Sequence, residues 1–379
     1  MARIVVTGYM IRHPVAGNIL AFFQYLMGLH LLGHQVVYLE ESGWAYSCYN
    51  PDTREWQDSP EAGLKIVRGV LAKYKLNIPV CYVNRETGNI TGIEWNELKQ
   101  LLKETDLLLN IGGVCWLPEF RLCNRRALID MDPFFSQVQG FASKVLDDYQ
   151  LHFSYGTNIG NSDCKIPTCG IKWLSIVPPV IPELWTGAKP RDNAPFTTIG
   201  NWGAYGEIVL DGESYGQKDV EFLRILNLPK YTRQRLELAI SGADEEVKEQ
   251  LRQAGWLVRD AGEEVSVDLQ TYKSYIAQSR AEFSVAKNAY VKTKSGWFSD
   301  RTVCYLAAGI PAIIQDTGFS NWLPTESGIL SFSSMDEAIR RIETVNSDYL
   351  KHRRAALAVA EEFFSYRVVI PKILEEALK

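Results

Sequence analysis

The sequence has no long hydrophobic run and no excess of positive charge. No apolar stretch approaches the roughly 20 residues that a helix needs to cross a bilayer. The formal net charge is −5, which argues against a nucleic-acid-binding class, because such proteins usually carry a basic face. That charge does not exclude a small local basic site. The start, MARIVVTGYM, turns polar too early for a signal peptide, so we expect a soluble, cytoplasmic protein.

Motifs of several nucleotide and metal sites are also missing. GxGxxG follows neither of the two strands after which it would be expected, where the sequence reads TGYMIRHPVAGN and IGNWGAYG, and this argues against a nicotinamide enzyme. No GxxxxGK[ST] is present, which argues against a P-loop nucleotidase. The seven cysteines are scattered without CxxC spacing. We therefore expect free thiols and no metal site.

Strand and helix patterns alternate along the chain instead. Residues 3–7 (RIVVT) predict a strand, NILAFFQYLMGLHLLG predicts a helix that ends at Gly33, and HQVVYLE predicts the next strand. The alternation resumes after residues 177–195, which hold five of the sixteen prolines and predict a linker. This pattern predicts an α/β fold with two Rossmann-like domains, residues 1–180 and 195–350, followed by helices over 351–379.

One stretch, SGWFSDRTVCYLAAGIPAIIQDTGF, combines a helix start with a buried strand. Ser299 is a good N-cap for a helix that ends at Gly309. The first turn of a helix exposes unpaired N–H groups, so with Arg301 and nearby lysines it predicts a seat for a diphosphate. Asp300 could accept a hydrogen bond from a ribose hydroxyl. The alternative is an ordinary capped helix beside a solvated lysine loop.

The same stretch, with LPTESGILSFSSMDEAIRRI after it, resembles the donor-binding region of glycosyltransferase-B enzymes. LAAGIPAII stands where those enzymes have a Gly-x-Pro turn, and DTGF stands near their donor sugar. The resemblance implies two Rossmann-like domains facing a central cleft, with a C-terminal helix crossing back to the N-terminal domain. The N-terminal domain would then hold the acceptor and the C-terminal domain the nucleotide sugar.

The resemblance also implies the activity. The protein would move a sugar from a nucleotide sugar, UDP- or GDP-linked, to a hydroxyl or similar acceptor, without a metal or another cofactor. The acceptor could be a small molecule, a peptide, a lipid-linked sugar or a nucleic-acid base. One departure concerns two glutamates that many retaining members carry across this loop and helix, because Gly296 and Cys304 stand there instead. A phosphate seat survives this departure better than a particular ribose contact does.

Residues that follow predicted strands, or lie in the resembling stretch, form the predicted donor site. Trp202 could stack on a base or an acceptor ring, and Lys218 could pair with phosphate, although ordinary loop packing explains each equally well. The full predicted set is Gly17, Asn18, Asn201, Trp202, Lys218, Lys287, Trp297, Phe298, Ser299, Asp300, Arg301, Asp316, Thr317 and Gly318.

A possible general base lies in the loop after the first strand. His13 could take a proton from the acceptor hydroxyl, since an unperturbed imidazole titrates near neutral pH. In many inverting glycosyltransferase-B enzymes a histidine in this loop has that role, oriented by an aspartate on a later strand. Here that aspartate would be Asp130 or Asp132, and we predict the pair His13 and Asp132. The alternative is that His13 is a plain loop residue and the aspartates cap a turn before Pro133.

Two other functions fit the same outline. A nucleotide-sugar epimerase would turn over the donor with no acceptor. A non-catalytic binding protein would hold the ligand but release no nucleoside diphosphate.

Overall fold

The computed structural model describes residues 1–138, 146–204 and 206–379. The chain forms two compact units. Unit 1 contains Met1–Gly156, Pro167–Pro179 and Tyr366–Lys379, and unit 2 contains Thr157–Ile166 and Val180–Ser365. The predicted helical tail, residues 351–379, therefore divides between the units: its first part belongs to unit 2 and its last helix to unit 1. Among the described residues, no helix has the length and apolar character needed to cross a membrane.

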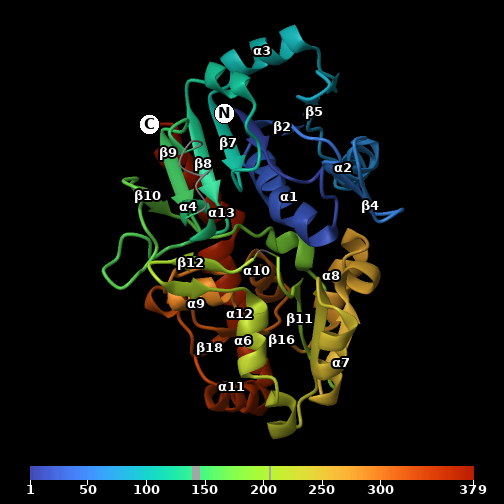
Figure 1. Ribbon diagram of the computed structural model, residues 1–379, viewed down its shortest axis with the longest axis vertical. Coiled ribbons are helices and arrows are strands. Elements are labelled where there is room, and N and C mark those ends of the chain that lie inside the picture. Colours follow the sequence, from blue (N-terminus) through green and yellow to red (C-terminus); the bar gives the residue numbers. More distant parts are fainter. Residues whose placement is uncertain (139–145, 205) are drawn as a thin grey trace. The chain divides into compact units, whose positions relative to one another are not determined.

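Unit 1 is built on a sheet of order β10-β9-β8-β7-β1-β2-β5-β6, in which each pair is parallel except β5 with β6 (Figure 1). Its strands are β1 Arg3–Thr7, β2 Gln35–Ser42, β5 Val80–Asn84, β6 Ile90–Thr91, β7 Leu107–Ile111, β8 Arg126–Asp130, β9 Leu151–Ser154 and β10 Trp173–Ser175, with a separate hairpin of β3 Cys48–Asn50 and β4 Glu55–Gln57. Its helices are α1 Ala16–Leu31, α2 Glu61–Lys73, α3 Trp95–Lys103, η1 Pro118–Leu122, α4 Phe135–Val138 and α13 Tyr366–Ala377.

Unit 2 is built on an all-parallel sheet of order β15-β14-β11-β16-β17-β18. Its strands are β11 Phe196–Asn201, β14 Leu236–Ser241, β15 Leu257–Asp260, β16 Ala281–Ser284, β17 Ala312–Gln315 and β18 Ile329–Phe332, with a hairpin of β12 Ile208–Leu210 and β13 Glu213–Tyr215. Its helices are η2 Pro182–Trp185, α6 Lys218–Arg224, η3 Leu228–Tyr231, α7 Glu245–Gln253, η4 Ala261–Val265, α8 Leu269–Gln278, α9 Asn288–Lys292, α10 Asp300–Ala307, η5 Phe319–Asn321, α11 Met335–Ser347, α12 Tyr349–Val359 and η6 Ala360–Phe364.

The last helix, α13, packs against α1 within unit 1 (Figure 1). Gly28 allows this close approach, because a Cβ placed on it would lie 2.4 Å from Ile370 Cδ1 and 3.0 Å from Tyr366 Cβ. The apolar stripe of α13 is buried at this contact. The final residues of the chain therefore complete the core of unit 1.

Each sheet has one point where the strand order reverses. In unit 1 the chain leaves β1 for β2 on one side and returns to β7 on the other, and in unit 2 the same occurs around β11, between β14 and β16. In open parallel sheets, ligands bind outside the carboxyl ends of the strands at such a reversal. The loops after β1 and β7, and after β11 and β16, are therefore the places to look for a site.

Candidate functional site

Helix α10 begins beside the reversal point of unit 2, as the sequence predicted. The Ser299 hydroxyl caps it by accepting a hydrogen bond from Arg301 N at 3.2 Å. Gly309 ends it with a φ of 68°, in the left-handed region that glycine adopts at little cost. A small pocket at this helix start is lined by Trp297, Ser299, Arg301, Thr302 and Thr317, among others. The Thr302 hydroxyl is buried there and has no hydrogen-bond partner among the described residues.

Arg301 has a different role from the one that the sequence predicted. Its guanidinium is buried and forms an ion pair with Glu282 at 2.7 Å, and it also donates to Ile199 O at 2.7 Å and to Ser284 Oγ at 2.9 Å. These partners engage the Nε, Nη1 and Nη2 atoms of the guanidinium and hold it in place. Arg301 is thus a fixed positive charge behind the site rather than a side chain that reaches for a ligand.

Lys218, at the start of α6, is a second cation near this helix start. A Cβ placed on Gly200 would lie 3.0 Å from Lys218 Nζ and 3.8 Å from Arg301 Nη1, so the two cations meet over this glycine. Burial, together with the positive charges of Arg301 and Lys287, lowers the pKa of Lys218 to about 7, and the nearby carboxylates of Glu282 and Asp300 offset this only in part. Among the described residues, the Lys218 ammonium makes no hydrogen bond or ion pair that would offset this.

Gln217, which precedes Lys218 in the chain, and Asp300, which interacts with its ammonium, also belong to this region. The amide nitrogen of Gln217 is buried and has no hydrogen-bond acceptor in the described part of the chain. Burial raises the pKa of Asp300, whose carboxyl interacts electrostatically with Lys218. A buried donor without an acceptor is costly, and so is a buried cation without a counter-charge.

Several predicted donor residues build the walls of this region. Trp202 is buried and stacks on Phe222 with ring centroids 5.7 Å apart, so one face of its ring is covered by the core of unit 2. Phe298 is also buried and stacks on Phe364 at 4.8 Å. Trp297 packs on Tyr290 at 4.6 Å. This packing agrees with the alternative of ordinary packing for Trp202, and stacking of its other face on a ligand ring stays a prediction.

The turn after β17 is held by its own hydrogen bonds. The Asp316 carboxylate accepts from Gly318 N at 2.8 Å and from Ser320 Oγ at 2.6 Å, while the Thr317 hydroxyl donates to Trp297 O at 2.7 Å. Gly318 has a φ of 93°. Asn201, which is exposed, accepts a hydrogen bond from the Ser241 hydroxyl, and Lys287 places its ammonium 5.3 Å from the centre of the Tyr290 ring.

In unit 1 the loop after β1 is organised by a buried carboxylate that the sequence analysis missed. Glu40, on β2, accepts from Ile11 N at 2.8 Å and from Arg12 N at 2.7 Å, and its carboxylate pairs with the buried Arg12 guanidinium at 3.3 Å. The Tyr38 hydroxyl donates to it as well. The available signal was the pair of glutamates, Glu40 and Glu41, that directly follows the apolar run VVYL in HQVVYLEES.

His13 lies in this loop, between aromatic rings. Its ring stacks on Trp56 with centroids 5.6 Å apart and planes 4° apart, and on Tyr9 at 5.6 Å and 30°. Burial lowers its pKa to about 4, so the imidazole is neutral near pH 7. Asn18, in the first turn of α1 beside Gly17, donates its side-chain amide to His13 O at 2.8 Å and to Tyr9 O. Asn18 therefore fixes the loop through its side chain.

The structure does not pair His13 with Asp132. Among the described residues, no hydrogen bond or ion pair joins the two, and β7 separates β8, which precedes Asp132, from β1. Asp130 is the buried carboxyl at the end of β8, accepting from the Ser136, Gln137 and Ser154 side chains. Burial raises its pKa. Asp130 therefore braces the loop after β8, and the predicted dyad is replaced by a histidine held by aromatic rings.

Comparison with known proteins adds the fold class. No family model and no curated protein sequence matches the chain, but solved structures match its full length. An alpha-glucosyltransferase solved with UDP has a TM-score of 0.60 at 10% identity, with 100% of both chains covered. HepE from Anabaena, solved with UDP and glucose, has 0.57 at 11%, with 99% of each chain covered. Sucrose-phosphate synthase from Thermosynechococcus elongatus has 0.57 at 11%, covering 99% of this chain and 98% of that one.

The chain thus has the two-domain GT-B fold of the glycosyltransferases, as the sequence predicted. The proteins it resembles over its whole length are an alpha-glucosyltransferase, HepE and a sucrose-phosphate synthase. At 10–11% identity these likenesses show the fold alone.

Proposed function

We propose that the chain is a glycosyltransferase that moves a sugar from a UDP- or GDP-linked donor to a hydroxyl or similar acceptor. One observation carries the proposal: the Lys218 ammonium lies beside Arg301 and Lys287, with no hydrogen bond or ion pair to it in the described residues, at the strand-order reversal of unit 2. A diphosphate supplies the missing negative charge. Neighbours of the same fold that were solved with UDP support testing a UDP donor first.

In this proposal each group at the site has a defined part. Lys218 Nζ and Gln217 Nε2 donate to the diphosphate oxygens, and the N–H groups at the start of α10 face the same charge. Arg301, held by Glu282, adds a fixed positive field. When the sugar leaves, these groups stabilise the negative charge that develops on the nucleoside diphosphate. The proposal asks for no divalent ion, so transfer is expected to persist in a chelator.

The acceptor belongs to unit 1 in this proposal, at the loop that carries His13. A neutral imidazole can take the proton of an acceptor hydroxyl, and its low pKa makes it a weak base unless a bound acceptor changes its surroundings. The rings of Tyr9 and Trp56 hold it in place. Asp132 takes no part in orienting it.

The donor site is tested by binding. In a thermal-shift screen against UDP-, GDP-, ADP- and TDP-sugars, a ligand at about 100 times its dissociation constant stabilises the protein by roughly 2.7 kcal/mol. We expect one of these ligands to raise the melting temperature of the wild type and of Lys103→Met, a surface variant on α3, but not that of Lys218→Met. If no nucleotide sugar shifts the wild type, or if Lys218→Met binds normally, the proposed site is wrong.

Transfer itself is tested by product release. We expect nucleoside diphosphate to be released from the donor that binds only when an acceptor is added from a mixed panel of sugars, lipid-linked sugars, peptides and oligonucleotides. Conversion of the donor sugar without any acceptor would instead identify an epimerase. Tight donor binding with no turnover in any mixture would identify a binding protein.

A further inference from the structure

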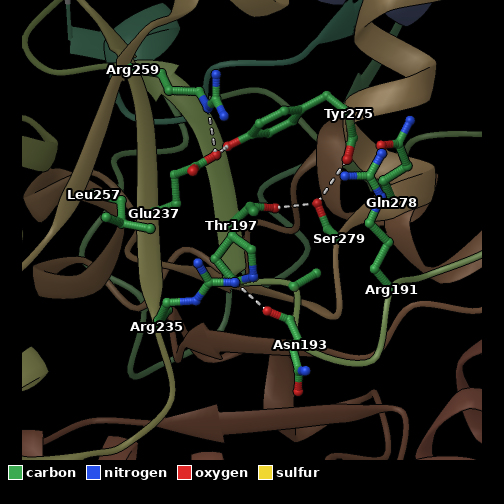
Figure 2. Close-up of a pocket in the computed structure, with 12 residues that line it drawn as sticks. Arg191, Asn193, Thr197, Arg235, Glu237, Leu257, Arg259, Tyr275, Gln278 and Ser279 are labelled. Atoms are coloured by element: carbon green, nitrogen blue, oxygen red, sulfur yellow. Dashed lines mark hydrogen bonds and ion pairs between the residues drawn. The ribbon is translucent and has the colours of Figure 1, made fainter.

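Three adjoining hollows line the opposite edge of the sheet in unit 2, where β11 and β14 begin. Their volumes are about 400, 470 and 670 Å³. The first shares Asn193 and Arg235 with the second, and the second shares Arg233 and Asn346 with the third, so they form one elongated groove. Figure 2 shows the first hollow, with Arg191, Arg235 and Arg259 around it. We name the whole the arginine groove, after its basic lining residues Arg191, Arg233, Arg235, Arg259, Arg280 and Lys230.

The arginine groove carries positive charge that its own acidic groups do not offset. Among the described residues, the Arg191 and Arg233 side chains make no hydrogen bond or ion pair, and both are exposed. Arg259, by contrast, is paired with Glu237 at 3.0 Å and Glu264 at 2.9 Å. Segments 189–195 and 230–235 hold five basic residues and one acidic residue, in a chain of 40 basic and 45 acidic residues. Such a local excess attracts an anion.

The elongated shape of the groove and the exposed ring of Tyr231 indicate which kind of anion the arginine groove binds. Tyr231 lines the third hollow beside Lys230, and 60% of its surface is exposed. Cationic grooves with exposed aromatic rings are typical of single-strand nucleic-acid binding, in which phosphates follow the cations and bases stack on the rings. A concave, elongated surface fits a strand better than it fits a flat bilayer. We propose that the arginine groove binds single-stranded nucleic acid, with phosphates at Arg191 and Arg233 and a base on Tyr231.

The arginine groove is separate from the candidate donor site. The groove lies where β11 begins and the donor site where β11 ends, and a strand of six residues spans about 17 Å. A strand bound in the groove therefore leaves Lys218 free. The proposal stands apart from the proposed transferase activity, so failure of the nucleotide-sugar screen does not affect it.

The first test measures how binding of an oligonucleotide depends on salt and on the two exposed arginines. A fluorescein-labelled oligothymidylate of about 20 nucleotides is titrated with the full-length protein, and anisotropy is followed between about 50 and 200 mM salt. We expect Arg191→Ser/Arg233→Ser to bind at least about tenfold more weakly and to lower the salt slope by about 1.4, since each lost phosphate contact removes about 0.7. The matched control, Arg121→Ser/Arg354→Ser, removes two exposed arginines elsewhere and should bind like the wild type. Equal melting temperatures show that both variants fold.

The second test separates nucleic acid from other polyanions. Tyr231→Ala should weaken oligothymidylate binding at least about fivefold, because a stacked base is lost, while inorganic polyphosphate, which has no bases, should bind both proteins equally. The proposal is overturned if the oligonucleotide does not bind, if both double variants lose affinity equally, or if Tyr231→Ala changes nothing. Preferential binding to anionic phospholipid vesicles, with the same dependence on Arg191 and Arg233, would also overturn it in favour of a membrane surface.

Discussion

Each unit has a buried arginine–glutamate pair beside the loop where its strand order reverses, and the two pairs are completed differently. In unit 1, both oxygens of Glu40 are used, by the Arg12 guanidinium, by two backbone N–H groups and by Tyr38. In unit 2, Glu282 binds Arg301 through one oxygen, while its other oxygen is buried with no partner among the described residues.

The residues next to the two arginines also differ, because one is a neutral side chain and the other is a second cation. Beside Arg12 lies His13, which burial between aromatic rings keeps neutral. Beside Arg301 lies Lys218, a second cation with a pKa lowered to about 7 by burial and by its cationic neighbours. The pair in unit 1 is internally complete and shapes a loop. The pair in unit 2 leaves one acceptor oxygen unpaired and has a second cation beside it, and we propose that an anion binds at that cation.

The largest effects are expected from neutralising the two glutamates. Breaking a buried ion pair typically costs about 3–5 kcal/mol, because the remaining charge stays buried. We expect Glu40→Gln to lie near the top of that range, since Glu40 also accepts backbone hydrogen bonds, and Glu282→Gln near the bottom. Urea unfolding followed by circular dichroism measures the difference.

Double variants provide the control for that comparison. Replacing both partners by apolar residues, as in Arg12→Met/Glu40→Leu and Arg301→Met/Glu282→Leu, removes the unpaired charge and should recover much of the loss. If Glu282→Gln proves as costly as Glu40→Gln, the two pairs are equally complete and the contrast between the units disappears.

The next effect concerns the pH dependence of donor binding. A bound diphosphate favours the charged form of Lys218, so it raises the pKa of that ammonium from its value of about 7 and takes up a proton. We expect the affinity for a UDP-sugar, whose diphosphate is esterified at both ends, to be constant below about pH 7 and to fall by up to about tenfold per pH unit above it. Isothermal titration calorimetry in two buffers of different ionisation enthalpy measures the proton uptake directly.

Lys218→Arg is the matched variant for this experiment, because a guanidinium stays charged throughout the range. Its affinity should be flat where that of the wild type falls. The free wild-type protein should also gain stability as pH rises from about 7 toward the ordinary lysine pKa, since the folded state holds the proton less tightly than the unfolded state does. A wild-type affinity that does not change between pH 6 and about 9 would contradict the role given to Lys218.

Local patterns in the sequence were enough to predict two α/β domains and the ends of α10, whereas the GT-B fold was predicted from a family resemblance. The periods of apolar residues predicted parallel strands and helices, and the single residues Ser299 and Gly309 marked the start and end of that helix through backbone chemistry that acts within a few residues. Contacts of this kind depend little on the rest of the chain, so they can be predicted from the sequence alone.

The partners of Arg301, Trp202 and Asp132 could not be predicted in the same way. Arg301 pairs with a glutamate on β16, and this contact depends on how α10 packs on the sheet. Trp202 and Asp132 lie just beyond the ends of β11 and β8, where the alternation of strand side chains no longer sets their direction. Packing of the loops decides instead that Trp202 enters the core and that Asp130 braces the loop after β8. A pattern names candidate residues, whereas packing assigns their partners.

The smallest effect concerns the aromatic rings around His13. Trp56 covers one face of the imidazole, and burial lowers its pKa from 6.5 to about 4. Trp56→Ala should raise that pKa by about one unit, because water reaches the charged form. Trp95→Ala is the control, since Trp95 lies on α3 and donates to Gly88 O at 3.1 Å. Two-dimensional NMR of the imidazole nitrogens during a pH titration measures both variants.

The same pKa predicts how the stability of unit 1 responds to acid. The folded-state pKa of His13 is depressed, so the unfolded chain binds the proton first, and stability falls as pH drops from about 6.5 to about 4. Trp56→Ala should narrow that window from its acid side. If instead the His13 pKa is unchanged in Trp56→Ala, the ring does not keep the imidazole neutral. The low pKa of His13, and with it the contrast with the cationic region at Lys218, would then need another cause.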